Sequence, residues 1–131
     1  FGAKKALFIG DRLDTDIMGA SRVGIDSVLV LTGIDRPKHV LAAPEGSRPT
    51  YILGDLRELH LPYPEVTEHD GVFRVNGAAV RVSGADVEIV SESGEQIDLL
   101  RAGAAAIWAS GTPVFVLRVP ERLYDDPFHR P

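Results

Sequence analysis

The sequence contains no cysteine. This absence excludes disulfide bonds, thiolate nucleophiles and cysteine-ligated zinc, and it is typical of a cytoplasmic protein. Positive charge is also in short supply, because 14 Lys and Arg residues stand against 19 Asp and Glu, for a net charge of -5. Since nucleic acid backbones are bound by clustered Lys and Arg, we expect no nucleic acid partner.

Long hydrophobic runs are absent as well. No apolar stretch approaches the roughly 20 residues that a transmembrane helix needs, so we expect no membrane contact. Hydrophobic residues make up 44% and charged residues 25% of the 131 positions, which is typical of a folded globular chain. The four histidines are scattered and lack the helical spacing of metal ligands, so we expect them to lie at the surface. They are His39, His60, His69 and His129.

The most informative stretch runs from Gly10 to Ile17 and reads GDRLDTDI. It follows the apolar run 6–9, which is typical of a buried strand in a parallel sheet. Its aspartates would therefore lie at the carboxyl end of that strand, where open α/β sheets bind their ligands. An oxygen donor set without cysteine or a neighbouring histidine suits Mg²⁺.

We assign the direct metal contact to Asp11, because it follows Gly10 where the backbone leaves the strand. Asp16 is better placed to hold a metal-bound water or to orient a partner, and Asp14 is expected to be a surface residue. Spacing alone leaves an alternative open, in which Asp14 and Asp16 only cap a helix and Asp11 only solvates a turn.

The first 62 residues are predicted to form a parallel sheet with helical crossovers. Asp14 or Thr15 is expected to cap the first helix and Gly24 to end it. Three strands leave at least one sheet edge uncovered, so a further part of the protein is expected to cover it. The predicted elements are a strand over 6–9, a helix over 16–23, a strand over 27–31, a helix over 35–43, a strand over 50–53 and a short helix over 54–59.

From residue 63 the pattern changes to hairpins. Asn76-Gly77 between two apolar runs predicts a type I′ turn, and the stretch from Ser93 to Gln96 is a capping-box pattern. Asp98 and Arg101 are expected to pair on the solvent side of the helix that follows. The predicted elements are strands over 72–75, 78–82 and 86–90, a helix over 96–109, a last buried strand over 114–119 and a mobile end over 125–131.

The string from Gly10 to Ile17, with 19–24 and 28–33 after it, resembles the fourth motif and its sequel in the haloacid dehalogenase (HAD) superfamily. Residues 48–52 and 55–59 are similar to the branch of p-nitrophenylphosphatase-like and glycerol-phosphate phosphatases. The resemblance implies an α/β class: a partial Rossmann-like parallel sheet over 1–62, the carboxyl-terminal half of a phosphatase core, followed by a small α+β unit over 63–131. It also implies that Asp11 binds Mg²⁺ and that Asp16 supports the metal site.

The family's nucleophile and general acid lie in an Asp-x-Asp motif that precedes the fourth motif, and a Ser/Thr and a Lys that bind phosphate lie between them. Nothing in this sequence matches them. The resemblance therefore implies a carboxyl-terminal portion of a Mg²⁺-dependent phosphomonoester phosphatase with a phospho-aspartyl intermediate, acting on glycerol 3-phosphate or a similarly small ester. The expected partner is the missing amino-terminal half, in the same chain or as a separate fragment.

Residues 63–131 resemble, more weakly, an acetyltransferase-like appendage of some actinobacterial phosphatases, on the order of elements and the Ala-rich helix that ends near Trp108. They lack a Gly-rich loop for acetyl-coenzyme A, so we expect docking on the core or on a second subunit instead. Two alternatives stay open, a non-catalytic binding or oligomerisation module and a receiver-like or Rossmann-like ligand-binding domain. Thr32-Gly33 is expected to form a turn, and Arg12 and Lys38 to be solvated.

Overall fold

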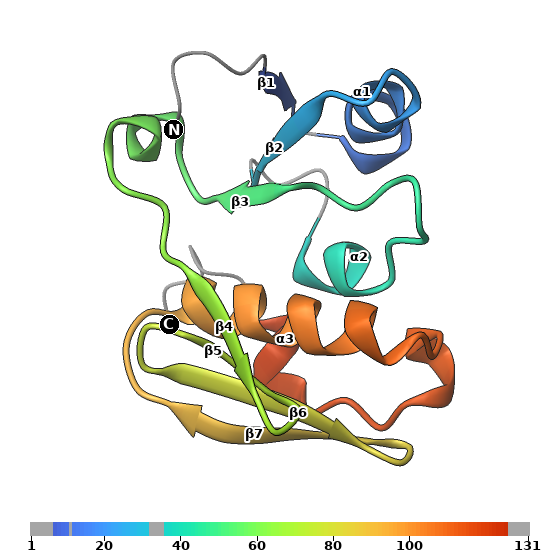
Figure 1. Ribbon diagram of the computed structural model, residues 1–131, viewed down its shortest axis with the longest axis vertical. Coiled ribbons are helices and arrows are strands. Elements are labelled where there is room, and N and C mark those ends of the chain that lie inside the picture. Colours follow the sequence, from blue (N-terminus) through green and yellow to red (C-terminus); the bar gives the residue numbers. More distant parts are fainter. Residues whose placement is uncertain (1–6, 11, 32–35, 126–131) are drawn as a thin grey trace. The chain divides into compact units, whose positions relative to one another are not determined.

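The computed structural model describes residues 7–10, 12–31 and 36–125. The chain divides into two compact units, Phe1–Tyr63 and Pro64–Pro131. The first contains a three-stranded parallel sheet and the second a four-stranded antiparallel sheet (Figure 1), which confirms the α/β class with a small α+β unit after it. No helix within the described ranges has the length and apolar character of a membrane span.

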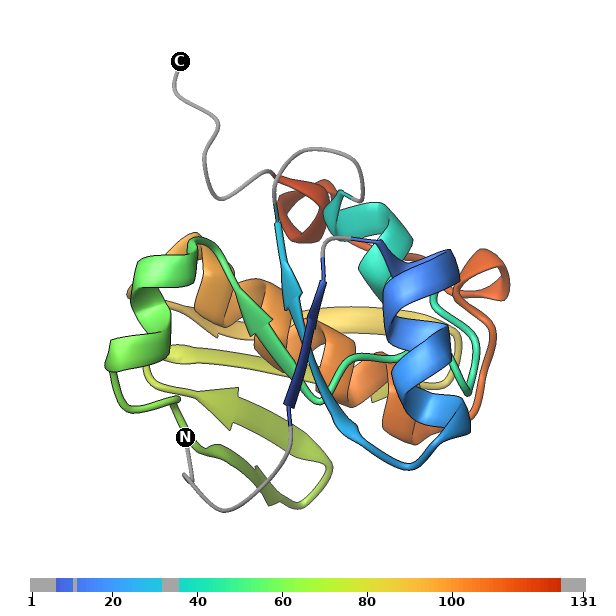
Figure 2. The ribbon, with the colours of Figure 1, turned by 90° about the horizontal axis from the view of Figure 1, so that it is seen from above.

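The sheet of the first unit has β2 at its centre (Figure 2). β1 (Leu7–Gly10) and β3 (Tyr51–Leu53) both pair with β2 (Asp26–Val30) in parallel. Val28 in β2 is fully buried, as expected for a central strand. β1 was expected to be covered on both faces, but Ile9 is 43% exposed. β1 lies at an edge of the described sheet and pairs only with β2 there.

The helix after β1 begins earlier than predicted. A π-helical turn, η1 (Leu13–Ile17), leads directly into α1 (Met18–Arg22), so Asp14 and Thr15 lie inside the helical segment and neither is its cap. The backbone N–H groups of residues 16 and 17 both donate to the Arg12 carbonyl at 3.1 Å, which starts the helix directly after the strand. Gly24 has a φ of 72° and ends the helix as predicted.

The remaining elements of this unit appear where the sequence predicts them. α2 (Pro37–Leu41) begins with its proline, and η2 (Leu56–His60) is a short 3₁₀ helix after β3. Tyr63 accepts a hydrogen bond at its hydroxyl from the N–H of Ile52, at 2.9 Å, and so shields one donor of β3. One cluster of the core consists of Val28, Val30 and Leu53, with Tyr51, Leu59 and Tyr63 packed against them.

The second unit contains one strand that the sequence analysis missed. The sheet order is β4-β5-β6-β7, and the missed strand is β4 (Val66–His69). Asp70 and Gly71 join it to β5, with φ values of 52° and 80°. Positive φ at both positions is the signature of a type I′ turn, so this Asp-Gly pair was the available signal. The other strands are β5 (Val72–Val75), β6 (Ala78–Ser83) and β7 (Asp86–Glu92).

The hairpin at Asn76-Gly77 exists, but its predicted turn type is wrong. Asn76 has a φ of 51°, whereas Gly77 lies outside the left-handed region, and type I′ needs both residues there. Gly77 is required for space instead, because a Cβ on it would stand 2.4 Å from the Ser93 hydroxyl. That hydroxyl donates to the Gly77 carbonyl at 3.2 Å, so Ser93 does not cap the next helix and the capping-box prediction is also wrong.

The predicted long helix is present as α3 (Gln96–Ser110), and it packs on the sheet. Asp98 and Arg101 pair at 3.0 Å as expected, but they are only 4% and 7% exposed, so their placement on the solvent side is wrong. Asn76 donates a second hydrogen bond to Asp98, at 3.0 Å. The pair tolerates burial because each oxygen of the carboxylate has a donor.

The last predicted strand, 114–119, is wrong. Val114–Val116 form a 3₁₀ turn, η3, between Pro113 and Pro120, and Phe115 is 84% exposed. Only Arg118 reaches the sheet, through backbone hydrogen bonds to residues 85 and 87 beside β7. A further turn, η4 (Glu121–Tyr124), follows, and residues 126–131 of the end predicted to be mobile lie outside the described residues.

Candidate metal-binding site

The structure tests only part of the predicted acidic site. Asp11, the predicted metal ligand, lies outside the described residues, as does the side chain of Asp14. Thr32-Gly33, predicted to form a turn, lies outside them too. Within the ranges that are described, no group of three or more His, Asp or Glu side chains is arranged to hold a metal ion. The geometry that can be examined is therefore that of Asp16 and the end of β1.

Asp16 lies against the last residue of β1. A Cβ built on Gly10 would stand 2.3 Å from the Cβ of Asp16 and 2.7 Å from its Oδ2 atom. The Asp16 carboxyl group thus packs on the bare Cα of Gly10, directly beside the peptide that leads to Asp11. Because Asp16 is half-buried there, its carboxyl group belongs to the strand end and not to the outer surface of the helix.

The wide turn η1 is what directs Asp16 back to the strand. Leu13 and Ile17 anchor the turn in the core, where they are 7% and 0% exposed. Single π-turns occur often at functional sites, because the extra residue redirects a side chain without ending the helix. Arg12, next to the turn, is exposed, and so is Lys38, as the sequence predicts for both.

A second Gly-Asp pair, at the carboxyl end of β3, provides an internal comparison. Asp55 follows Gly54 in the same way that Asp11 follows Gly10, and parallel strands present both ends at one edge of the sheet. Its carboxylate accepts the Arg57 backbone N–H at 2.8 Å and two guanidinium N–H groups. Those hydrogen bonds to Arg57 hold the pKa of Asp55 below its ordinary value. Asp55 is therefore a helix cap with its own counter-ion.

The donor set at the end of β1 fits a hard divalent cation. Carboxylate oxygens are the ligands that Mg²⁺ prefers, and it usually takes one or two of them while keeping several waters. Asp16 provides one such carboxyl group against Gly10, and Asp11, the residue after Gly10 in the sequence, is the second acid of the predicted set. The choice of Asp11 as the metal ligand stays a prediction.

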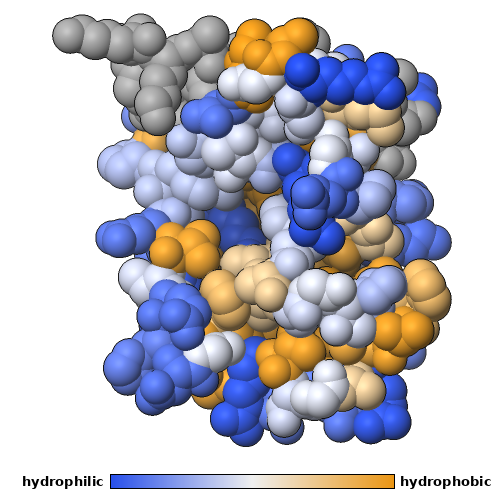
Figure 3. Space-filling view, turned by 45° about the vertical axis from the view of Figure 1, so that its right-hand side comes forward, coloured by the Kyte–Doolittle hydropathy of each residue, from blue (hydrophilic) through white to orange (hydrophobic). Residues whose placement is uncertain are grey.

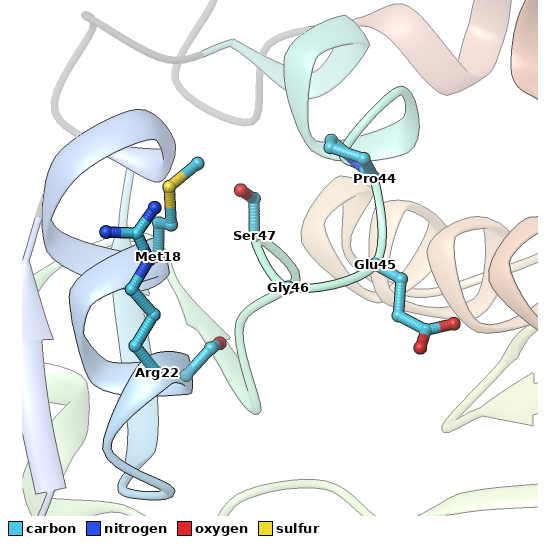
Figure 4. Close-up of a pocket in the computed structure, with 7 residues that line it drawn as sticks. Met18, Arg22, Pro44, Glu45, Gly46 and Ser47 are labelled. Carbon is cyan, nitrogen blue, oxygen red and sulfur yellow. The ribbon is translucent and has the colours of Figure 1, made fainter.

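A pocket of about 310 Å³ lies elsewhere in the same unit (Figure 4). Met18, Ser21 and Arg22 of α1 line one side, and the loop 44–47 lines the other. Both α1 and α2 run antiparallel to the strands as crossovers, so their last turns and this loop lie toward the amino ends of the strands. The pocket is thus separate from the acidic strand end.

Hydrophobic residues also reach the surface away from this site. Figure 3 shows one face of the molecule, on which they form separate patches between hydrophilic residues. Among the described large hydrophobic residues of the first unit, Val23 and Leu61 are the most exposed, at 68% and 59%. Among those of the second unit, Phe115 is the most exposed. None of these residues adjoins Asp16 in the sequence, so they do not extend the candidate site.

Comparison with known proteins shows what the first unit is similar to. Residues 2–59 match the model of the HAD-hydrolase-like family. The D-glycerol 3-phosphate phosphatase of Mycobacterium tuberculosis (strain ATCC 25618 / H37Rv) is 39% identical over 109 residues, which are 80% of this chain and 31% of that protein. The 4-nitrophenylphosphatase of Schizosaccharomyces pombe (strain 972 / ATCC 24843) is 40% identical over 60 residues, 45% of this chain and 20% of that protein.

Solved structures agree. The glycerol phosphate phosphatase of Mycobacterium tuberculosis in complex with magnesium matches with a TM-score of 0.70 and 36% identity, over 87% of this chain and 32% of that chain. The same phosphatase in complex with calcium matches with a TM-score of 0.64 and 34% identity, over 82% of this chain and 31% of that chain. The present chain thus spans about a third or less of the proteins it matches.

The two sequence matches cover different lengths of this chain. A match of 109 residues is longer than the 63 residues of the first unit, so the similarity to the mycobacterial phosphatase continues into the second. The acetyltransferase-like character of that second unit stays a prediction. The resemblance of the first unit to HAD phosphatases is confirmed by the family match and by both relatives. Residues 2–59, somewhat less than half of this chain, thus resemble the HAD-hydrolase-like family.

Proposed function

We propose that this chain is the metal-binding, carboxyl-terminal portion of a Mg²⁺-dependent phosphomonoester phosphatase. The observation that carries the proposal is the packing of the Asp16 carboxyl group on Gly10, the residue that precedes Asp11 in the sequence. The family match over 2–59 and the similarity to a glycerol phosphate phosphatase crystallised with magnesium support it.

In this proposal Asp11 contacts the metal and Asp16 orients a metal-bound water or a neighbouring ligand. A bound Mg²⁺ ion would neutralise phosphoryl charge and bring an anionic nucleophile and an anionic substrate together. The proposed nucleophile is an aspartate of the amino-terminal half, which attacks phosphorus, displaces the alcohol of the ester and forms a phospho-aspartyl enzyme. Water then hydrolyses this intermediate, which releases inorganic phosphate and restores the aspartate. That half is also the partner that we propose to cover the edge of β1, where Ile9 is 43% exposed.

The proposed substrate is glycerol 3-phosphate or a similarly small ester. The support is the similarity to the mycobacterial D-glycerol 3-phosphate phosphatase over 80% of this chain. The similarity to the 4-nitrophenylphosphatase covers 45% of the chain. It supports the reaction class, but it gives no further support for glycerol 3-phosphate as the substrate.

The decisive experiment uses the full-length phosphatase that contains these residues. Asp11→Asn keeps the size of the side chain and removes its charge, so turnover of glycerol 3-phosphate and Mg²⁺ affinity should both fall by much more than about 100-fold. Asp16→Asn should lower both by roughly 10- to 100-fold, which is typical of residues that support a metal ligand. The matched control, Asp14→Asn, should stay within about twofold of the parent.

The readouts are initial rates across a Mg²⁺ titration and calorimetric Mg²⁺ binding without substrate. Equal and mild effects from Asp11→Asn and Asp14→Asn would contradict the metal assignment. In that case the non-catalytic binding or oligomerisation module would become the better description of this chain.

A further inference from the structure

The end of β1 raises the question of why residue 10 is a glycine. A glycine is required either where φ is positive or where another group comes close to the backbone. Gly10 ends a regular parallel strand paired with Leu29, and its φ lies outside the left-handed region. Backbone freedom is therefore not the reason, and space is.

The space beside Gly10 is filled by Asp16. The nearest atom to a Cβ built at Gly10 is the Asp16 Cβ, at 2.3 Å, and the carboxyl carbon and Oδ2 follow at 2.7 Å. A clash with the far end of a flexible side chain is relieved by a change of rotamer. A clash with a Cβ is not, because that atom moves only with its backbone.

The backbone of Asp16 has little freedom to move. Its N–H and that of Ile17 share the Arg12 carbonyl, each at 3.1 Å. Ile17 is fully buried, so a shift of the turn would also displace a core side chain. A methyl group at residue 10 would therefore push the Asp16 carboxyl group off the strand end.

We propose that Gly10 is a positioning residue of the metal site: its missing side chain lets the Asp16 carboxyl group stand at the end of β1. This inference rests on the proposed function, because it assigns a purpose to the place where Asp16 is held. Gly10 itself contributes no ligand. It acts only through Asp16, and that separates it from a residue that merely supports the fold.

A double-mutant cycle in the full-length phosphatase tests this. The variants are Gly10→Ala, Asp16→Gly and the two combined, since Asp16→Gly removes both the carboxyl group and the clashing Cβ. Gly19→Ala is the matched control, because a Cβ at Gly19 has no atom within 4 Å. Mg²⁺ dissociation constants are measured by calorimetry without substrate, and circular dichroism gives the melting temperature of each variant.

We expect Gly10→Ala to weaken Mg²⁺ binding about 10- to 100-fold, as for other residues that orient a metal ligand. Asp16→Gly should weaken it to a similar extent, and the double variant no further than Asp16→Gly alone. Gly19→Ala should bind Mg²⁺ within about twofold of the parent, because it changes nothing near the site. If Gly10→Ala fails to fold, the double variant should restore folding, because it removes the Asp16 side chain against which the new methyl group clashes.

Three outcomes would overturn the inference. In the first, Gly10→Ala binds Mg²⁺ like the parent while Asp16→Gly does not. In the second, adding Gly10→Ala to Asp16→Gly lowers the affinity further. In the third, the double variant does not fold. The proposed function fails separately, if Asp11→Asn keeps normal Mg²⁺ affinity. The two failures are thus distinguishable within one set of proteins.

Discussion

The two units of this chain bury their elements differently. The second encloses α3 between a four-stranded sheet and the turn η4, whose Leu123 is fully buried and would lie 2.9 Å from a Cβ at Gly103. The first has a three-stranded sheet whose edge residue Ile9 is 43% exposed. The candidate metal site lies in the first unit, at the end of that edge strand.

Charge follows the same division. The first unit has eight basic and eight acidic residues, whereas the second has six and eleven, so the whole net charge of -5 falls on the second. Two acids of the second unit form ion pairs, Asp98 with Arg101 and Asp86 with Arg118. Asp16 in the first unit packs on the Cα of Gly10 at the end of a strand. In our proposal the two pairs stabilise the fold, whereas Asp16 supports a metal site.

The largest effect that we expect on this contrast comes from breaking the buried pair in α3. Asp98→Ala leaves the Arg101 charge buried without its carboxylate, which should lower the free energy of unfolding by about 3 to 5 kcal/mol. The measurement is urea denaturation followed by the fluorescence of Trp108, the single tryptophan, which lies in α3.

Two variants make that result specific. Glu95→Gln, at an exposed position whose side chain makes no cap hydrogen bond, should change stability by less than about 0.5 kcal/mol. Replacing both members of the pair, Asp98→Leu with Arg101→Leu, should recover most of the loss. A drop below about 1 kcal/mol for Asp98→Ala would show that the pair does not hold the second unit together.

A smaller effect tests whether the two units unfold separately. Val28 in β2 and Val80 in β6 are both fully buried, so changing either to alanine should cost about 2 to 3 kcal/mol in its own unit. Because Trp108 reports on the second unit, Val80→Ala should shift the fluorescence transition and Val28→Ala should leave it in place. Methyl NMR signals of Leu53 follow the first unit. Equal shifts of the fluorescence transition by both variants would indicate one cooperative unit instead.

The smallest effect concerns exposed ion pairs, present in both units. Hydrogen bonds from Arg118 lower the pKa of Asp86, and those from Arg57 lower the pKa of Asp55. A lowered carboxyl pKa stabilises the fold above the unfolded value of about 3.9 and loses that contribution as pH falls through the folded value. Arg118→Gln and Arg57→Gln should each return the carboxyl pKa of its partner to the ordinary range, measured by NMR titration.

Stability should then differ from the parent at neutral pH and converge with it in acid. Both differences should also fade in about 1 M salt, because exposed pairs are screened. A difference that grows as pH falls would contradict the assigned sign.

The repeating pattern of apolar residues predicted most of the fold correctly. The parallel strands, α2, the hairpin strands β5, β6 and β7, and α3 all appear within a few residues of their expected positions. These elements depend on local periodicity, which the sequence displays directly. All four residues of the missed strand β4 are exposed and show no apolar periodicity, and only the Asp70-Gly71 turn marks the strand in the sequence.

Two of the errors arise from packing that local spacing does not show, and a third arises from prolines. Ser93 is a plausible cap by spacing, but its hydroxyl bonds to Gly77, 16 residues away. Asp98 and Arg101 have the spacing of a solvated pair, but the burial of α3 encloses them. The stretch 114–119 is apolar enough for a strand, but its flanking prolines favour a 3₁₀ turn over sheet pairing.

Local spacing and residue type were enough to predict the order of most elements, the resemblance of residues 2–59 to the HAD-hydrolase-like family and the acidic string in which a metal ligand is expected. Folding was needed to distinguish the acid that caps a helix, the acid in a buried pair and the acid at a strand end. Asp55, Asp98 and Asp16 take these three roles. The role of a carboxyl group depends on the groups that folding brings near it. Asp16 can stand at the end of β1 because Gly10 has no side chain to occupy that space.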